Sequence, residues 1–159
     1  MIAYRIGSRR HPIFDGSGAA EYGALWNSPG RSVIYAASSL SLAMLEQLAH
    51  TETGRLPHDH AFITITIGDS MPKATLSLSD VAGWNIADVA ASRAYGDRWL
   101  AEQRTCILLV PSVIVPIESN VLINPSHADF ARVVASVPRN VNWDKRLKVF
   151  KERGETRGR

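Results

Sequence analysis

Three side chains capable of chemistry lie close together in residues 26–46. Arg31 follows a Pro-Gly turn, Tyr35 ends a short apolar run, and Glu46 lies among leucines. Arg5, near the N-terminus, is a second arginine, and the guanidinium groups of Arg5 and Arg31 match the geometry of phosphate oxygens. The ring of Tyr35 offers a flat surface for a planar heterocycle. A partly desolvated carboxylate stabilises a cationic, sugar-centred transition state. The set suits cleavage of an N-glycosidic bond in a dinucleotide such as NAD, one of several ideas that the residue types leave open.

The element that must position Glu46 is a helix. A serine at 38 or 39 is a favoured N-cap, and the residues up to about His50 are compatible with a helix. Helical spacing puts Glu46 on the same face as three apolar residues, Leu42, Leu45 and Ala49. A carboxylate beside an apolar stripe needs a partner or a purpose, since burying it unpaired is costly. Taken singly, Glu46 would lie at the edge of the apolar stripe and either extend its carboxylate to solvent or pair with arginine. Tyr35 would pack in a core, and Arg31 would be solvated.

The other expected elements are short and mixed in type. Strands are predicted at 2–6, 33–36 and 62–67, the last from its alternation of apolar and polar residues. Helices are predicted at 92–102 and 127–136. The run Ile107 to Pro116 is interpreted as two apolar strands broken by Pro111, with another strand in NVLINPSH after it. Strands and helices do not alternate regularly, so the sequence favours an α+β fold in a single domain.

Composition and charge narrow the function classes. The chain has 159 residues, 45% hydrophobic and 21% charged, with no apolar run of membrane-spanning length and no signal-like N-terminus. Its one cysteine, Cys106, lies in an apolar run. These features predict a cytoplasmic protein without a membrane partner. Residues 145–159 have seven Lys or Arg and two Glu, a net +5, so the rest of the chain is −2 and a direct nucleic-acid partner is not expected.

Motifs for other chemistry are weak. His58 and His60 flank Asp59, but nothing nearby completes a ligand set, so no metal site is expected. An RNA-cleaving site is disfavoured, because the body of the chain is slightly acidic and has no evident catalytic histidine pair.

The order of several short segments resembles the RES-domain family, the toxins of bacterial toxin–antitoxin pairs. The resemblance extends from about Ala3 to about Leu147, which predicts a domain at 1–147 and a basic tail at 148–159. The matching segments are Tyr4-Arg5, Tyr22-Gly23, Trp26-Asn27-Ser28-Pro29-Gly30, Val33-Ile34-Tyr35, Glu46, Gly96-Asp97-Arg98-Trp99-Leu100, Val110-Pro111-Ser112 and Asn124-Pro125-Ser126-His127.

The resemblance implies a fold, an activity and site residues. Family members resemble ADP-ribosyltransferases, with a split, mostly antiparallel β core flanked by helices, and they consume NAD without a metal. By that likeness Glu46 supports the oxocarbenium centre, Tyr35 stacks on the nicotinamide side, and Ser112 binds the ligand or orients Glu46. Arg5 and Arg31 would grip the pyrophosphate, and Asn27 is counted with the residues that bind NAD. A helix-turn-helix (Xre-like) antitoxin is the implied partner.

One departure from the family pattern concerns the acceptor. The family commonly has Gly-Gly-Arg-Trp-Asn where this chain has Gly23-Ala24-Leu25-Trp26-Asn27, so the family's arginine is absent and Arg31 is the candidate replacement. The favoured function is transfer of ADP-ribose from NAD to a cellular protein. The alternatives are an NAD phosphorylase or glycohydrolase, with phosphate or water as acceptor, and a catalytically inactive interaction module.

Overall fold

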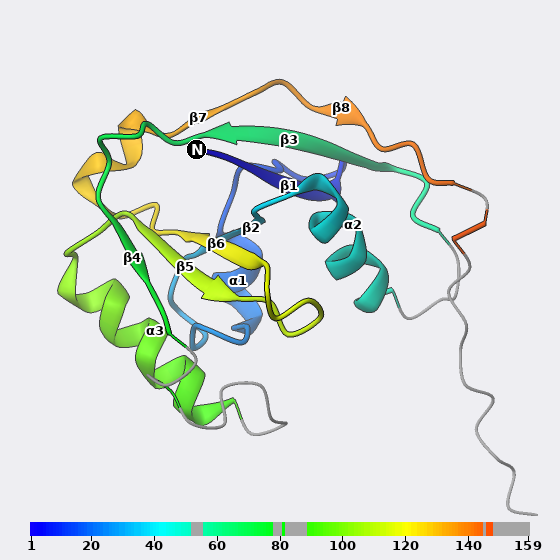
Figure 1. The fold of residues 1–159 in the computed structure, drawn as a ribbon. Helices are drawn as coiled ribbons and strands as arrows, with labels where there is room; N and C mark the ends of the chain where they lie inside the picture. Colours follow the sequence, from blue (N-terminus) through cyan, green and yellow to red (C-terminus); the bar gives the residue numbers. More distant parts are fainter. Residues whose placement is uncertain (52–55, 78–80, 82–88, 145, 148–159) are drawn as a thin grey trace, which may run out of the picture.

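The computed structural model describes residues 1–51, 56–77, 81, 89–144 and 146–147. These residues form eight strands, two longer helices, one short helix and one 3-10 helix (Figure 1). The strands are β1 (Ile2–Ser8), β2 (Ile34–Ala37), β3 (His60–Thr66), β4 (Lys73–Thr75), β5 (Ile107–Pro111), β6 (Ser119–Ile123), β7 (Val134–Ala135) and β8 (Arg139–Asn140). The helices are α1 (Ser17–Tyr22), α2 (Leu40–Ala49), α3 (Ala90–Glu102) and the 3-10 helix η1 (Ala128–Arg132).

The strands form one mixed sheet in the order β4-β5-β6-β2-β1-β3-β7, with β8 also paired to β3. Only β4 and β5 are parallel, and the other pairs are antiparallel. Between β1 and β2 the register contains one residue pair, Tyr4 opposite Ala37. The sheet is therefore nearly divided at this point, and the predicted α+β fold with a split, mostly antiparallel core is confirmed.

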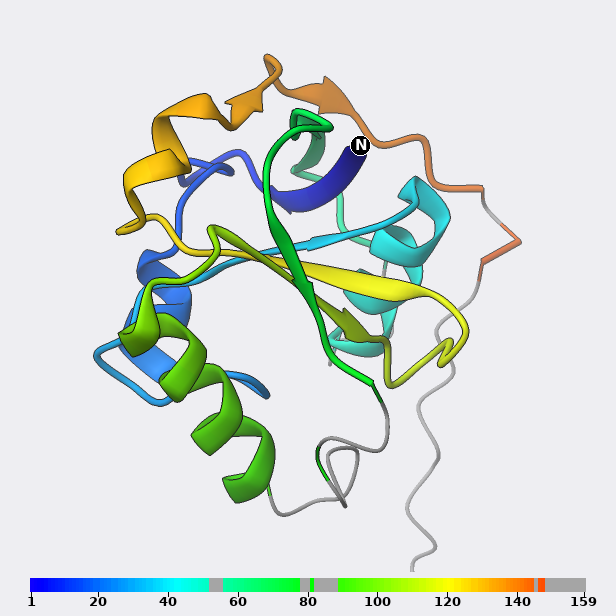
Figure 2. The ribbon, with the colours of Figure 1, turned by 60° about the vertical axis from the view of Figure 1, so that its left-hand side comes forward.

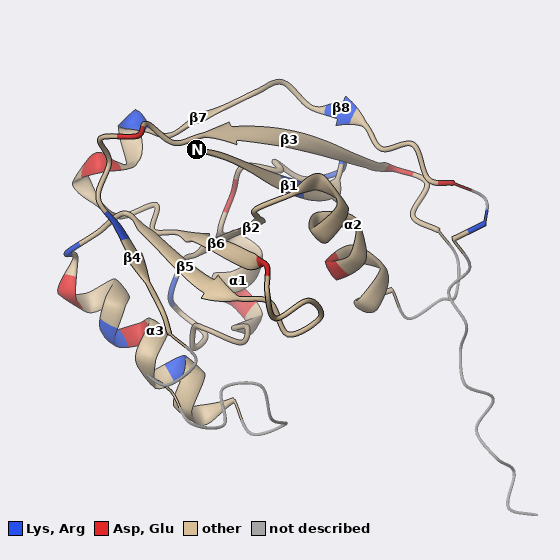
Figure 3. Ribbon diagram, viewed as in Figure 1, with Lys and Arg blue, Asp and Glu red and all other residues tan. Residues whose placement is uncertain are grey.

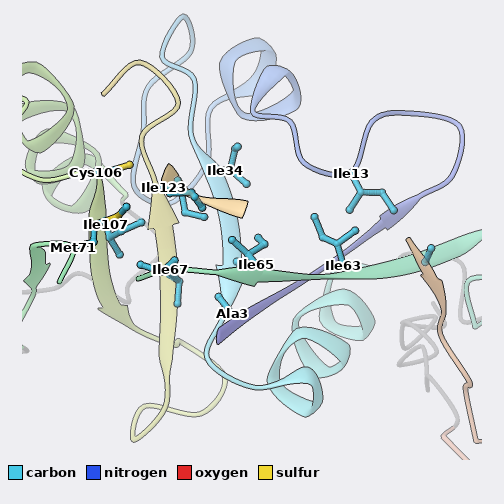
Figure 4. Close-up of a cluster of buried hydrophobic side chains, with 14 residues drawn as sticks. Ala3, Ile13, Ile34, Ile63, Ile65, Ile67, Met71, Cys106, Ile107 and Ile123 are labelled. Carbon is cyan, nitrogen blue, oxygen red and sulfur yellow. The ribbon is translucent and has the colours of Figure 1, made fainter. Parts of the chain in front are cut away.

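One face of the sheet holds the largest apolar cluster (Figure 4). Ile63, Ile65 and Ile67 of the β3 region are 2% exposed or less, as the alternation in this strand predicts. They pack with residues from other strands and from the 13–16 loop, among them Ala3, Ile13, Ile34, Ile107 and Ile123. This cluster contains residues from both halves of the divided sheet. The other face has two smaller buried clusters, one around Leu108, Val110 and Leu122 and one around Ala37.

Helix α2 begins as predicted but presents a different face to the protein. Ser39 is its N-cap, and its hydroxyl accepts a hydrogen bond from the Leu42 backbone N–H at 3.1 Å. Leu42 and Ala43 are buried against Ala37 and against side chains of β1, whereas Leu45 is 42% exposed. The expected apolar stripe through Leu45 is wrong, because α2 contacts β1 and β2 through the face that contains Leu42 and Ala43.

Two other expectations need correction. Of the two strands expected between Ile107 and Pro116, only β5 is formed, and it ends at Pro111. Residues 113–118 make a largely exposed connection to β6, with Ile117 96% exposed. Proline at 111 and again at 116 removes backbone donors that a second strand would need. The helix expected at 127–136 is only the 3-10 helix η1, since the chain then extends and pairs with β3 as β7.

Helix α3 lies beside β4 and β5, in both orientations of the molecule shown in Figures 1 and 2. Positive and negative residues alternate along it (Figure 3), which is usual for a solvent-facing helix.

Among the described residues, no helix combines the length and the hydrophobicity that a membrane span requires. The predicted basic tail, 148–159, lies outside the described residues.

Candidate active site

A cavity of about 710 Å³ opens where the sheet divides between β1 and β2. Its size is within the range of small-molecule sites. The lining side chains come from both strands, α2, the 23–26 loop, the loop after β5, and β6. They include Tyr4, Arg5, Leu25, Tyr35, Glu46, Gln47, His50, Ile114 and Asn120. Most of the remaining lining is alanine, so polar groups are few and specific in position.

Glu46 is the carboxylate of this cavity, and one of its oxygens is held by two donors. The Ser112 hydroxyl donates to Glu46 Oε1 at 2.9 Å, and Asn120 Nδ2 donates to the same oxygen at 2.7 Å. These bonds satisfy the requirement that a half-buried carboxylate has partners. Ser112 and Glu46 are 66 residues apart in sequence, and their contact corresponds to one of the two roles expected for Ser112.

Ser112 is fully buried and does not line the cavity. Its hydroxyl oxygen accepts hydrogen bonds from the backbone N–H groups of Ile114 and Val115, at 3.0 and 3.1 Å. With both acceptor positions used, the single hydroxyl proton is donated to Glu46. Of the two roles expected for Ser112, the geometry therefore supports orientation of Glu46 rather than ligand binding.

Tyr35 has a half-buried ring in the cavity wall and a hydroxyl that is hydrogen-bonded to the neighbouring loop. The hydroxyl donates to Asn27 Oδ1 at 2.7 Å and accepts from the Trp26 backbone N–H at 3.1 Å. Burial raises the pKa of Tyr35 well above its ordinary value, so the group stays neutral at physiological pH. Tyr35 lines the cavity, where its predicted stacking remains a prediction, and its hydroxyl is bonded to the 26–27 segment of the loop.

Asn27 lies away from the cavity. It is fully buried, and its Nδ2 contacts the carbonyl oxygens of Ala19, Ser28 and Arg31 at 2.8, 3.1 and 2.9 Å. Its Oδ1 is occupied by Tyr35. Because both ends of the amide hold the 19–31 segment together, the structure assigns Asn27 to loop architecture and does not bring it to a ligand, contrary to expectation.

Arg5 lines the cavity, but three of its N–H groups donate hydrogen bonds to backbone carbonyls. Its Nε, Nη1 and Nη2 donate to Ile13 O, Tyr35 O and Asp15 O at 2.6, 2.7 and 3.1 Å. Burial lowers the pKa of Arg5, and the Asp15 carboxylate opposes that shift. The guanidinium thus links β1, the 13–15 loop and β2 across the division of the sheet, a role that the sequence did not indicate.

Arg31 is not brought to the cavity. The chain turns at Gly30, where φ is +87°, and Arg31 Nε lies 3.4 Å from Asp97 Oδ1 on α3. The side chain is 44% exposed and absent from the lining. The expectation that Arg31 replaces the missing family arginine is therefore not supported, and Leu25 itself lines the cavity.

Helix α3 fixes the loop that contains Trp26. Asp97 Oδ1 accepts the Ser28 backbone N–H at 3.0 Å, and Arg93 Nε donates to Ala24 O at 2.9 Å. A Cβ at Gly96 would lie 1.8 Å from the Trp26 carbonyl oxygen, so only glycine allows this approach. The Gly96-Asp97 motif is thus explained as a clamp on the cavity wall.

Asn120 is the site residue that the sequence reasoning missed. The available signal was alternation in β6, where Asn120 shares a face with the buried Leu122. Register then sets Asn120 opposite Ala37 on β2 and Val110 on β5. A polar residue on an inward-facing strand position needs a partner, which here is Glu46.

The His58-Asp59-His60 segment makes local contacts. His60 Nδ1 is 2.9 Å from Asp59 Oδ1, and Asp59 pairs with Arg10 at 3.0 Å. Among the residues that the structure describes, no three or more of His, Cys, Asp and Glu are grouped to hold a metal ion.

Comparison with known proteins gives consistent matches. The RES domain model matches residues 2–144. A protein of Sphingobium sp. named Prs ADP-ribosylating toxin is 39% identical over 140 residues, with 83% of this chain and 84% of that protein covered. Toxin Res of Yersinia enterocolitica is 38% identical over 152 residues, covering 93% and 100%. A crystal structure of the Mycobacterium tuberculosis MbcT–MbcA toxin–antitoxin complex matches with a TM-score of 0.68 at 19% identity, covering 88% of this chain and 83% of that one, which shows a shared fold.

Proposed function

The chain belongs to the RES domain family, and on that premise we propose that it is the toxin of a toxin–antitoxin pair that transfers ADP-ribose from NAD to a cellular protein. The observation that supports this most directly is the Glu46 carboxylate, held by Ser112 and Asn120 in a cavity with an aromatic wall. The names of the Sphingobium and Yersinia relatives support it further.

The proposed reaction breaks the bond between the nicotinamide nitrogen and ribose C1′. The bonding electron pair stays on nicotinamide, which neutralises its ring charge, and positive charge develops on the ribose. Glu46 stabilises that charge electrostatically and then accepts the proton that the acceptor loses when its bond to C1′ forms. The Tyr35 ring holds the nicotinamide side, and the cation of Arg5 at the cavity favours the pyrophosphate.

Leu25 favours a protein acceptor over inorganic phosphate. Its apolar side chain lines the cavity where the family commonly has arginine, so it offers no charged contact to a free phosphate ion. The name of the Sphingobium relative makes Prs the first purified acceptor to test. An NAD phosphorylase or glycohydrolase remains the alternative activity.

The proposal also includes an antitoxin partner and a cytoplasmic location, where NAD is available. The solved structure with the matching fold is a toxin–antitoxin complex, which supports an antitoxin for this chain. A helix-turn-helix (Xre-like) domain in that partner is part of the proposal.

The test is nicotinamide release by the purified chain and by its Glu46→Gln variant. We expect release by the wild type, with label from adenylate-labelled NAD appearing on one protein of a cell lysate. Glu46→Gln keeps the shape and removes the charge, so release should fall about 100- to 1,000-fold while the melting temperature stays close to that of the wild type. Glu21→Gln, on α1 outside the cavity lining, is the matched control and should keep full activity.

Each remaining outcome has a defined meaning. Release that rises with added phosphate, without labelled protein, would replace the protein acceptor by phosphate. A folded Glu46→Gln variant with near-normal release would show that the carboxylate is misassigned. If the folded wild type released no nicotinamide under any condition, the protein would instead be a catalytically inactive interaction module.

A further inference from the structure

We infer that Asn120 is a positioning residue that, together with Ser112, holds Glu46 Oε1 as an acceptor and reserves Oε2 for the reacting groups. The inference rests on the proposed function and extends it to a residue outside the predicted site. Asn120 donates to Oε1 at 2.7 Å, the shorter of the two bonds at this oxygen.

The two donors define which form of the carboxylate is compatible with the site. The amide Nδ2 is only a donor, and the Ser112 hydroxyl has used its lone pairs on Ile114 and Val115. Oε1 must therefore accept from both, so a proton on Oε1 would face two other protons. In the part of the chain that the structure describes, Oε2 has no hydrogen-bond partner of this kind, and it is the oxygen left to meet substrate.

The donors are themselves held rigidly. Asn120 lies on β6 opposite Val110 of β5, and Ser112 follows β5 directly, so adjacent antiparallel strands present both groups to α2. The helix is fixed in turn by burial of Leu42 and Ala43. A carboxylate held between a sheet and a helix needs little reorientation when positive charge develops beside it. A preorganised charge of this kind is what electrostatic stabilisation of a transition state requires.

The kinetic test separates positioning from substrate binding. In Asn120→Ala, loss of one hydrogen bond to a charged group should lower kcat for nicotinamide release about 10- to 100-fold, with KM for NAD within about twofold of the wild type. Asn120→Leu keeps the side-chain volume but has no donor, so it should lower kcat to a similar extent. This second variant keeps the test valid if Asn120→Ala folds poorly. Ser119→Ala, on the neighbouring position of β6, is the control and should leave both constants unchanged.

A double variant tests whether Asn120 acts through Glu46. If it does, Asn120→Ala should cause little further loss in a Glu46→Gln background, because the group it positions is gone. Losses that multiply, or a raised KM with normal kcat, would overturn the inference and make Asn120 a substrate contact.

A readout without NAD keeps the inference distinct from the proposed function. The Asn120 side-chain NH₂ signals in a ¹H–¹⁵N spectrum should shift when Glu46 becomes Gln, and stay in place in Glu21→Gln. Unchanged signals would overturn the inference even in an active enzyme. Shifted signals in a chain that releases no nicotinamide would confirm the clamp and reject the proposed reaction.

Discussion

At the scale of single residues, Tyr35 joins two tasks in one side chain. Its ring lines the cavity, and its hydroxyl is the link between Asn27 and the Trp26 backbone. Removing only the hydroxyl removes both of these hydrogen bonds, whereas removing the ring also takes away part of the cavity wall.

This separation predicts different results for two variants. Tyr35→Phe should lower the free energy of unfolding by about 1–3 kcal/mol and leave KM for NAD nearly unchanged. Tyr35→Ala should destabilise the protein and also raise KM, because the stacking surface is lost. Urea titrations and steady-state nicotinamide release measure both effects. Equal increases of KM in the two variants would mean that the hydroxyl, not the ring, meets the substrate.

At the scale of elements, the division of the sheet is both the origin of the cavity and a structural weakness. β1 and β2 share only the Tyr4–Ala37 pair, so fewer ladder bonds hold this junction than its neighbours. Arg5 compensates by donating to three carbonyls from segments on both sides of it. A single side chain thereby replaces part of a missing β ladder.

Arg5→Lys tests this role, since it keeps the positive charge but loses the planar fork. Three carbonyls cannot be satisfied by one ammonium group in the same geometry, so the free energy of unfolding should fall by about 2–4 kcal/mol. Arg9→Lys, on an exposed arginine, should change it by less than about 0.5 kcal/mol in the same urea titration. A stable Arg5→Lys variant with weakened NAD use would instead favour the predicted phosphate contact.

At the scale of the whole molecule, ionisation of the Cys106 thiol depends on whether the largest apolar cluster is folded. Cys106 is 1% exposed within that cluster, and burial, with a smaller effect of the Asp129 charge, raises the pKa of its thiol to about 11. The unfolded chain releases the same proton near pH 9. The contribution of Cys106 to stability is therefore complete below about pH 9 and is lost as the pH rises toward 11.

The expected consequence is a steeper loss of stability in alkali for the wild type than for Cys106→Ala. The difference in slope should approach about 1.4 kcal/mol per pH unit between pH 9 and 11. Unfolding free energies from urea titrations at several pH values measure it, and the variant controls for the other groups that titrate in this range. Parallel curves for the two proteins would show that the thiol ionises equally in both states.

Sequence patterns are enough to predict several of the local elements and the central carboxylate. Alternation in β3 and the serine cap of α2 predicted that strand and that helix, because each depends on neighbours within one turn or one strand. Glu46 and Ser112 were predicted as site residues from the order of the family segments, although they are 66 residues apart in sequence. The sequence did not determine which arginine reaches the cavity. Arg31 turns away to Asp97, and Arg5 is engaged by carbonyls, through contacts between segments distant in sequence.

That Asn120 is a partner of Glu46 follows only from the assembled fold. The bond to Asn120 spans 74 residues and depends on the register of β6 against β2 and β5, together with the rotation of α2. Register and helix rotation are set by packing of the whole core, where a shift of one residue would turn Asn120 to the opposite face. Residue types along the chain identify a carboxylate that needs donors, and the assembled sheet selects which donors it receives.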